Sequence, residues 1–408
     1  MAIEPQTDAA ARLARDGGTP ARTRPEHPMF PGGMEVGDEE LAALERVVRS
    51  RNLFRYYGVG DGPGEVAAFE REFVELFGAQ HALCVNAGSS ALICGLIGAG
   101  VGPGDEVIVP AYTWNATPNA VIATGALPVL AEIDDSLTLD PADVEARITP
   151  RTRAILPVHM RGAPADMRAL TQLAQERGLV LVEDVCQAAG ASFEGRRLGT
   201  FGDAGAFSLQ FNKIITTGEG GVLITDRDDL YDLAIDVHDC AGPVRRGEGL
   251  PRFPGWNFRA SELTGAVARV QLRRLDGLLE RMRAAHRRLT AHASRLPGLT
   301  LRRATDDDGD AGIALIAFAE TAPLAREAVE ALQAEGVAAM QIYSPDVVDL
   351  HVYPYWKPIL ERIPAPHCPR TLDLLERAIH LDLSPLNDEQ DLAEIELALT
   401  KVATQVLD

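Results

Sequence analysis

Short apolar runs alternate with helical patterns along the first half of the chain. Runs without polar alternation occupy residues 81–85, 106–110, 127–133, 153–158, 179–184, 204–209 and 221–225. Runs of this length are typical of strands that are buried on both faces. Between residues 64 and 77, Val66, Phe69 and Phe73 recur at helical spacing. The pattern therefore predicts an α/β fold with a mainly parallel sheet and helices outside it.

The second half of the chain begins with a long helical pattern, followed by a mixed tail. The tail shows strand patterns at 313–318 and 337–343 and helical patterns at 324–336 and about 388–407. The polar N-terminus carries acids and lacks the apolar stretch of a signal peptide. We expect four parts: a poorly ordered leader over 1–30, a large domain over 31–260, a linking helix over 261–296 and a small C-terminal domain over 297–408.

Composition excludes several classes of protein. The 408 residues are 46% hydrophobic and 24% charged, which is ordinary for a globular protein. The net charge of −20 disfavours nucleic acid as a partner. No apolar run approaches the roughly 18 residues of a membrane-spanning helix. The five cysteines form no CxxC pair, as expected in a reducing compartment, so a cytoplasmic protein is predicted.

The segment FSLQFNKIITTGEGGVLIT, residues 207–225, places Lys213 between two predicted strands and before a glycine-rich turn. Most lysines simply lie on the surface. A lysine held among apolar strands can instead lose its proton and attack an aldehyde. Lys213 is therefore the candidate nucleophile, and Ser208 precedes it at the end of a strand.

A carboxylate ends another apolar strand. Asp184 closes VLVED, where an acid is rare unless it is paired. The carboxyl ends of parallel strands line the ligand crevice of such sheets. Asp184 could pair there with a protonated pyridine nitrogen, or it could cap the following helix, which is the more ordinary role of Asp.

Two further strand ends carry candidate groups. In VNAGSSALICGL, residues 85–96, Gly88, Ser89 and Ser90 open a helix whose N–H groups and hydroxyls can bind an anion, although an ordinary helix start has such residues too. Trp114 follows the next strand and could stack on a flat ring or pack in the core. The order of an anion-binding turn, an aromatic residue, a strand-end carboxylate and a lysine favours one shared cofactor site.

On these motifs the chain resembles the DegT/DnrJ/StrS family of pyridoxal-5′-phosphate (PLP) aminotransferases over roughly residues 35–405. The resemblance implies the aspartate-aminotransferase fold, called fold type I among PLP enzymes. That fold has a mainly parallel seven-stranded sheet flanked by helices and a smaller α/β C-terminal domain. It also implies a homodimer with its active site at the subunit interface.

The resemblance implies a role for each motif residue. Lys213 is expected to hold PLP as an imine and to carry the proton, while Asp184 pairs with the pyridine nitrogen. The other implied cofactor contacts are Gln187 near the ring oxygen, Trp114 on the ring, Gly88, Ser89, Ser90 and Ser208 at the phosphate, and Asn257 reaching the phosphate from the neighbouring subunit. No metal site is predicted.

The implied reaction moves an amino group from L-glutamate or L-glutamine to a keto-sugar or keto-cyclitol in antibiotic-type biosynthesis. Other PLP reactions on the same scaffold stay open: dehydration, aromatisation or oxidation. A non-catalytic regulator is disfavoured because Lys213, Asp184 and Gln187 are retained. A Rossmann oxidoreductase would need GxGxxG after an early strand, and AGSSAL does not match. In PVHMRG, Arg161 could meet an anionic substrate, although shaping the loop is its more ordinary role.

Overall fold

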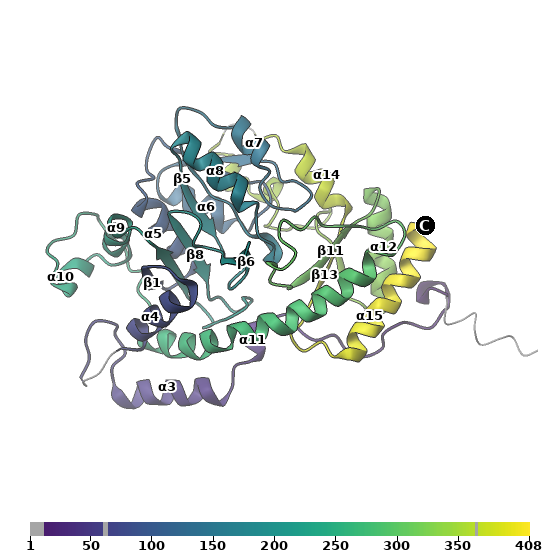
Figure 1. Ribbon diagram of the computed structural model, residues 1–408, viewed down its shortest axis with the longest axis horizontal. Coiled ribbons are helices and arrows are strands. Elements are labelled where there is room, and N and C mark those ends of the chain that lie inside the picture. Colours follow the sequence, from purple (N-terminus) through teal and green to yellow (C-terminus); the bar gives the residue numbers. More distant parts are fainter. Residues whose placement is uncertain (1–11, 60–63, 364–365) are drawn as a thin grey trace, which may run out of the picture.

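The computed structural model describes residues 12–59, 64–363 and 366–408 (Figure 1). Its large sheet has the strand order β1-β9-β8-β5-β4-β2-β3. The strands are β1 His81–Val85, β2 Glu106–Pro110, β3 Leu127–Ala131, β4 Thr152–Ile155, β5 Val180–Asp184, β8 Ala204–Ser208 and β9 Gly221–Thr225. Strand β9 runs antiparallel to both neighbours, whereas the other neighbouring strands pair in parallel. The predicted mainly parallel seven-stranded sheet is confirmed.

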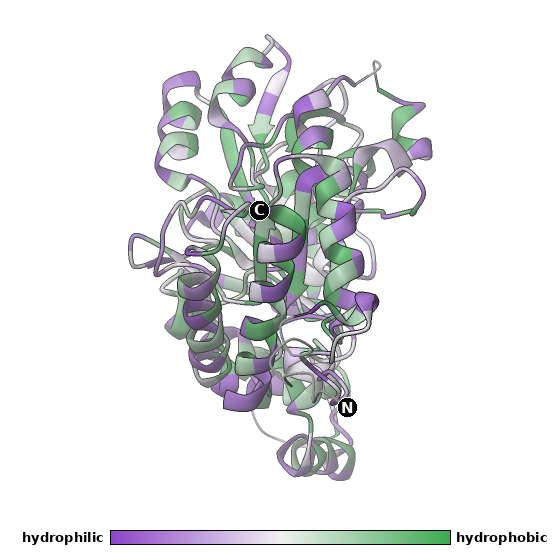
Figure 2. Ribbon diagram, turned by 90° about the vertical axis from the view of Figure 1, so that its right-hand side faces the viewer, coloured by the Kyte–Doolittle hydropathy of each residue, from purple (hydrophilic) through white to green (hydrophobic). Residues whose placement is uncertain are grey.

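Helices cover both faces of this sheet because its strands are apolar on both sides. Leu83, Val107 and Val109 face one apolar cluster, while Cys84 and Ile108 face the other. The first cluster lies under α5 Gly88–Gly98, α6 Ala116–Ala123 and α9 Asp228–His238, and the second under α4 Glu65–Phe77, α8 Met167–Arg177 and α11 Glu262–Ala293. Figure 2 shows the hydrophobic residues along the interior strands and the hydrophilic ones on outward helix faces.

A second, smaller sheet lies near the C-terminal end of α11. This long helix runs beneath both sheets in Figure 1. Its order is β10-β11-β13-β12, and all its pairs are antiparallel. The strands are β10 Thr300–Leu301, β11 Ala314–Phe318, β12 Ala339–Gln341 and β13 Ala378–Asp382. The helices packed with it are α12 Ala322–Ala334, α14 Pro369–Arg377 and α15 Glu389–Val402.

The sequence pattern did not predict β13, although this strand lies in the middle of the small sheet. It follows α14 directly, without a turn, and its apolar pattern is interrupted by His380 and Asp382. Apolar and polar residues do alternate over 379–382, but the run is short and no turn residue separates it from α14, so the segment lacks the flanking turn signals by which a strand is recognised.

The remaining elements are short, apart from α3. They are η1 Ala14–Asp16, α2 Pro31–Met34, α3 Asp38–Ser50, α7 Pro141–Ala146, η2 Met160–Gly162, β6 Ser192–Phe193, β7 Arg196–Arg197, α10 Gly242–Arg246, η3 Tyr353–Tyr355, α13 Lys357–Leu360 and the π-helical turn Ala403–Leu407. In the described residues, no helix has both the length and the apolar character needed to cross a membrane.

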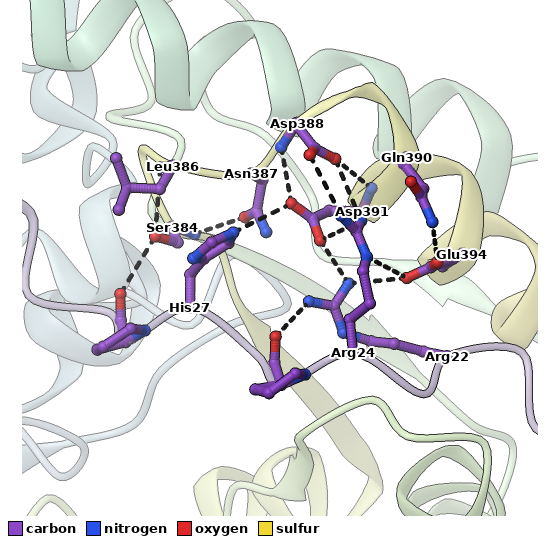
Figure 3. Close-up of polar contacts among 12 residues, drawn as sticks. Arg22, Arg24, His27, Ser384, Leu386, Asn387, Asp388, Gln390, Asp391 and Glu394 are labelled. Atoms are coloured by element: carbon purple, nitrogen blue, oxygen red, sulfur yellow. Dashed lines mark hydrogen bonds and ion pairs between the residues drawn. The ribbon is translucent and has the colours of Figure 1, made fainter.

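Residues 12–30, which we call the strap, differ from the poorly ordered leader expected over 1–30. The strap lies along α12 and α15, and an ion-pair cluster fixes it at the start of α15 (Figure 3). Arg22 Nη1 and Arg24 Nη2 each lie 2.7 Å from Asp391 Oδ1, and His27 Nε2 lies 3.3 Å from Asp391 Oδ2. These long-range pairs leave no mark in the local sequence. Residues 1–11 of the expected leader lie outside the described part.

Candidate active site

A cavity of about 480 Å³ opens at the carboxyl ends of β2, β5 and β8. This is the edge at which parallel α/β sheets bind ligands, because strand ends and helix starts converge there. Seven residues predicted from the sequence line it: Gly88, Ser89, Trp114, Asp184, Gln187, Ser208 and Lys213. Ser90 and Asn257, also predicted, do not line it in this chain.

Asp184 is the buried carboxylate of the cavity, with only 4% of its surface exposed. Its Oδ1 accepts a hydrogen bond from the Cys186 N–H at 3.0 Å, and its Oδ2 accepts one from the Thr117 hydroxyl at 2.8 Å. Among the described residues, no Lys, Arg or His nitrogen lies within 4.0 Å of it. A buried carboxylate without a cationic partner is costly. The site is therefore built to receive a positively charged group at Asp184.

Lys213 lies in the loop between β8 and β9, with its side chain half-buried in the cavity wall. Its N–H donates to the Gln210 carbonyl at 2.9 Å, and its own carbonyl accepts from the Gly32 N–H at 3.2 Å. The next two residues, Ile214 and Ile215, are buried. The backbone around the amine is thus fixed on both sides, as a positioned nucleophile requires.

The start of α5 faces the same cavity. A Cβ on Gly88 would lie 2.8 Å from Ser208 Cβ and 3.0 Å from Cys186 Sγ, so only glycine fits this close approach. Within the described chain, the N–H groups of Gly88, Ser89 and Ser90 have no hydrogen-bond partner, as is usual in a first helical turn. This end of α5 can bind an anion. The Ser90 hydroxyl points away and donates to Asn86 Oδ1 at 2.7 Å.

The amide of Gln187 is oriented by the neighbouring loop. Its Oε1 accepts a hydrogen bond from the Arg161 N–H at 3.0 Å, which leaves the Nε2 donors for a group in the cavity. Trp114 is 44% exposed, so it is not a core residue, and its ring lies 4.9 Å from the ring of His351.

Several cavity residues were not predicted from the sequence. Thr117, four residues after Thr113, donates to Asp184, and the Thr113 hydroxyl in turn lies 2.8 Å from that of Thr117. The signal was present in TWNAT, where i and i+4 fall on one helical face. Met29, just past the ion-pair cluster of the strap, and Asp382 at the end of β13 also line the cavity, and no local pattern indicates either.

Cys186 lines the cavity without the properties of a reactive thiol. Burial raises its pKa well above the ordinary value, and the neighbouring Asp184 raises it further. The protonated thiol packs against the Ala206 carbonyl, 3.8 Å away. In the described part of the chain, no group of three or more His, Cys, Asp or Glu side chains is arranged to hold a metal.

Asn257 lies outside the cavity, on an exposed segment paired with Asp239. Its carbonyl accepts a hydrogen bond from Asn86 Nδ2 at 3.3 Å. Its side chain is exposed, together with the neighbouring Trp256, which is 42% exposed.

Comparison with known proteins identifies the family. The sequence model of the DegT/DnrJ/EryC1/StrS aminotransferase family matches residues 35–400. A putative L-glutamine:3-amino-2,3-dideoxy-scyllo-inosose aminotransferase of Streptoalloteichus tenebrarius is 38% identical over 71% of this chain and 68% of its own length. The spore coat polysaccharide biosynthesis protein SpsC of Bacillus subtilis is 32% identical over 88% of this chain and 93% of its own length.

Solved structures show the same fold. S. venezuelae DesV, crystallised in complex with a ketimine intermediate, superposes with a TM-score of 0.81 at 34% identity, covering 94% of this chain and all of that one. 3-Amino-5-hydroxybenzoic acid synthase superposes with a TM-score of 0.79 at 29% identity, covering 94% of this chain and 100% of that one.

Proposed function

Because the chain belongs to the DegT/DnrJ/EryC1/StrS aminotransferase family, we propose that it moves an amino group from L-glutamine or L-glutamate to a keto-sugar or keto-cyclitol. PLP is the cofactor of the reaction. The observation that carries the proposal is that one cavity contains both the lysine Lys213 and the buried carboxylate Asp184, which has no cationic partner among the described residues. The name of the Streptoalloteichus relative supports glutamine as donor and a cyclitol ketone as acceptor.

The residues present fit PLP. When bound, PLP supplies an aldehyde for the amine and a pyridine ring that withdraws electrons from the substrate carbon. Asp184 would hold the proton on the pyridine nitrogen, since the ring would then supply the missing cation beside it. Gln187 Nε2 would donate to the ring oxygen, and Trp114 would cover one ring face.

The phosphate would bind at the start of α5. The free N–H groups of Ser89 and Ser90 and the positive end of the helix dipole favour a dianion there. The Ser208 hydroxyl lies beside Gly88 and would add a donor. The Ser90 hydroxyl is already bonded to Asn86, so Ser90 would contribute its backbone rather than its side chain.

Lys213 would act twice. Its Nζ would hold the cofactor through the aldehyde, and the same amine would serve as a proton carrier during the reaction. For the second role the amine would remain in the cavity wall, because its backbone is fixed by Gln210 and Gly32, and could take up and return a proton at the substrate carbon.

A homodimer is part of the proposal. Asn257 would reach the phosphate in the neighbouring subunit, because in this chain its side chain is exposed and outside the cavity. The preceding Trp256 is 42% exposed, and Leu250, earlier in the same segment, is 84% exposed, so a second copy that covered them would remove apolar surface from water. Sedimentation of the holoenzyme as a monomer would contradict this part.

Spectroscopy of the half-reaction tests the function. Adding L-glutamine or L-glutamate to the holoenzyme should replace the absorbance of the lysine-bound cofactor by that of pyridoxamine phosphate. Return of the lysine-bound form on adding a keto-sugar or keto-cyclitol, with release of an aminated product, would distinguish an aminotransferase from a dehydratase or oxidase. Lys213→Ala should lose both the bound-cofactor absorbance and turnover, whereas Lys357→Ala, at an exposed lysine, should behave as wild type. Full turnover by Lys213→Ala would refute the mechanism.

A further inference from the structure

Arg161 holds a backbone conformation that arginine rarely adopts. Its φ of 52° and ψ of 38° fall in the left-handed region, which costs a non-glycine residue of the order of 1 kcal/mol or more. Strained residues of this kind persist where the surroundings fix them, and they gather at ligand sites. The strained backbone at Arg161 therefore indicates a functional role for its side chain.

The surrounding chain holds this turn in place. The Arg161 N–H donates to Gln187 Oε1 at 3.0 Å, and the Ala163 N–H donates to the Met160 carbonyl at 3.1 Å. From the C-terminal half of the chain, the Ala311 N–H donates to the Gly162 carbonyl at 3.0 Å. Arg161 therefore stands at the junction of the two halves of the molecule, with its direction set by backbone contacts.

The guanidinium of Arg161 lines the cavity with its terminal nitrogens unused. Its Nε lies 3.4 Å from the Tyr112 hydroxyl, a long contact. In the described part of the chain, no carboxylate oxygen lies within 4.0 Å of the group, and Nη1 and Nη2 have no hydrogen-bond partner. Arg161 is also the only arginine among the described residues that line this cavity.

Two acids whose charges act on Arg161, Asp349 and Asp382, are already engaged by histidines. Asp349 Oδ1 lies 2.7 Å from His351 Nδ1, and Asp382 Oδ1 lies 3.1 Å from His380 Nε2. The negative charges of these acids offset part of the positive charge around Arg161. They do not contact its terminal nitrogens, which stay available to a ligand. A cation with free donors in a confined cavity favours an anionic ligand.

We infer that Arg161 binds the α-carboxylate of the amino donor, so that the site selects α-amino acids. The inference rests on the proposed function. A donor must place its amine at the position of Lys213 Nζ, and its α-carboxylate, one carbon away, must then lie in the same cavity. Arg161 offers two parallel N–H donors, which match the two oxygens of a carboxylate.

The experiment compares donors that differ only at that carboxylate. L-Glutamine and L-glutamine amide, whose α-carboxyl is a neutral carboxamide, are mixed with the holoenzyme, and the rate of cofactor conversion is followed against concentration. Arg161→Gln should raise the apparent Kd for L-glutamine by about 10- to 100-fold, the loss expected for a charge-assisted hydrogen bond, and leave that for the amide unchanged. Arg161→Lys should fall between.

Gln is chosen because it meets the same left-handed strain as Arg, so the backbone is not altered as it would be by glycine. The control is Arg168→Gln, at an arginine on the outer surface whose side chain is 74% exposed, which should change neither Kd. A second readout needs no reaction: calorimetric binding of glutarate, which has carboxylates and no amine, should weaken by the same factor in Arg161→Gln.

Each outcome decides the matter. Equal binding of L-glutamine and of glutarate by wild type and Arg161→Gln overturns the inference. So does a defect confined to the keto-acceptor half-reaction, which would place Arg161 on the acceptor or on an acceptor phosphate. If no amino acid converts the wild-type cofactor, the proposed function fails, and weaker glutarate binding by Arg161→Gln would still support a carboxylate site.

Discussion

Arg22→Met should destabilise the protein by breaking the innermost ion pair of the strap (Figure 3). The Arg22 side chain is 1% exposed, and that of Asp391, 2.7 Å away, is fully buried. Methionine preserves most of the aliphatic volume, so the loss reports the charge and its hydrogen bonds, including the bond from Nη2 to the Pro25 carbonyl at 2.9 Å.

The size of the effect follows from what remains around Asp391. Removing one partner of a buried ion pair costs about 3–5 kcal/mol, because the other charge stays buried without compensation. Here Asp391 keeps Arg24 at 2.7 Å and the Asp388 N–H at 2.8 Å, so it is not left alone. We therefore expect a loss of about 2–3 kcal/mol, below the full cost of an orphaned charge.

Urea unfolding of the wild-type and variant holoenzymes measures this loss, provided that the free energy of unfolding depends on urea concentration with the same slope in both. Arg15→Met is the matched control, since Arg15 lies on the same strap and pairs with Glu327 at the same 2.7 Å, but with side chains 28% and 50% exposed. An exposed pair contributes less than about 1 kcal/mol. Equal losses for the two variants would show that burial does not set the strength of the cluster. Faster proteolysis of the strap should accompany Arg22→Met alone.

Three further predictions concern the site and the fold. Thr117→Val removes the hydroxyl that donates to Asp184 Oδ2 at 2.8 Å, and should lower turnover about tenfold with PLP still bound, as steady-state kinetics would show; an unchanged rate contradicts the role. Gly88→Ala forces a Cβ to within 2.8 Å of Ser208 Cβ and should raise the Kd for PLP in a titration of the apoenzyme, whereas Ser89→Ala should have a smaller effect. Burial lowers the pKa of His238 from 6.5 to about 3, so the unfolded chain takes up a proton that the folded chain refuses. The free energy of unfolding should therefore fall by about 4 kcal/mol more in wild type than in His238→Gln as the pH drops from about 6.5 to 3. If the unfolding free energies of the two proteins depend on pH in the same way, this explanation is wrong.

The floor of the site follows from local patterns in the sequence. Each of Asp184, Ser208 and Trp114 lies at or just past the end of an apolar run, and parallel strands bring such ends to one edge. Lys213 and Gly88 follow from the turn chemistry around them. Strand periodicity and a few glycines therefore indicated six of the seven predicted residues that line the cavity, whereas Gln187 was implied by the family resemblance.

The rest depends on contacts between distant segments, which no local pattern encodes. The strap reaches Asp391 from Arg22, 369 residues away. Strand β13 takes its place in the small sheet because β11 and β12 pair with its two edges, not because its own sequence is strongly strand-like. The side chains that these segments bring to the cavity, Met29 and Asp382 among them, could not be predicted.

Local sequence patterns predict the residues on the large sheet but not those that distant segments bring to the cavity, so the sequence indicates the reaction more clearly than the substrate. The groups proposed to hold the cofactor and move the proton lie at strand ends of the large sheet or in the loops that follow them, so adjacent strands fix their spacing. The groups facing them come from the strap, from the loop that carries His351 and from β13, and the acceptor must fit between the two sets. His351 is held there by distant pairing, since its carbonyl accepts from the Thr113 N–H at 2.9 Å and its ring meets Trp114. Acceptor specificity should therefore change when the strap and the His351 loop are exchanged between relatives, while the chemistry at Lys213 is preserved. Chimaeras that keep their parental acceptor after such an exchange would place the specificity on the large sheet instead.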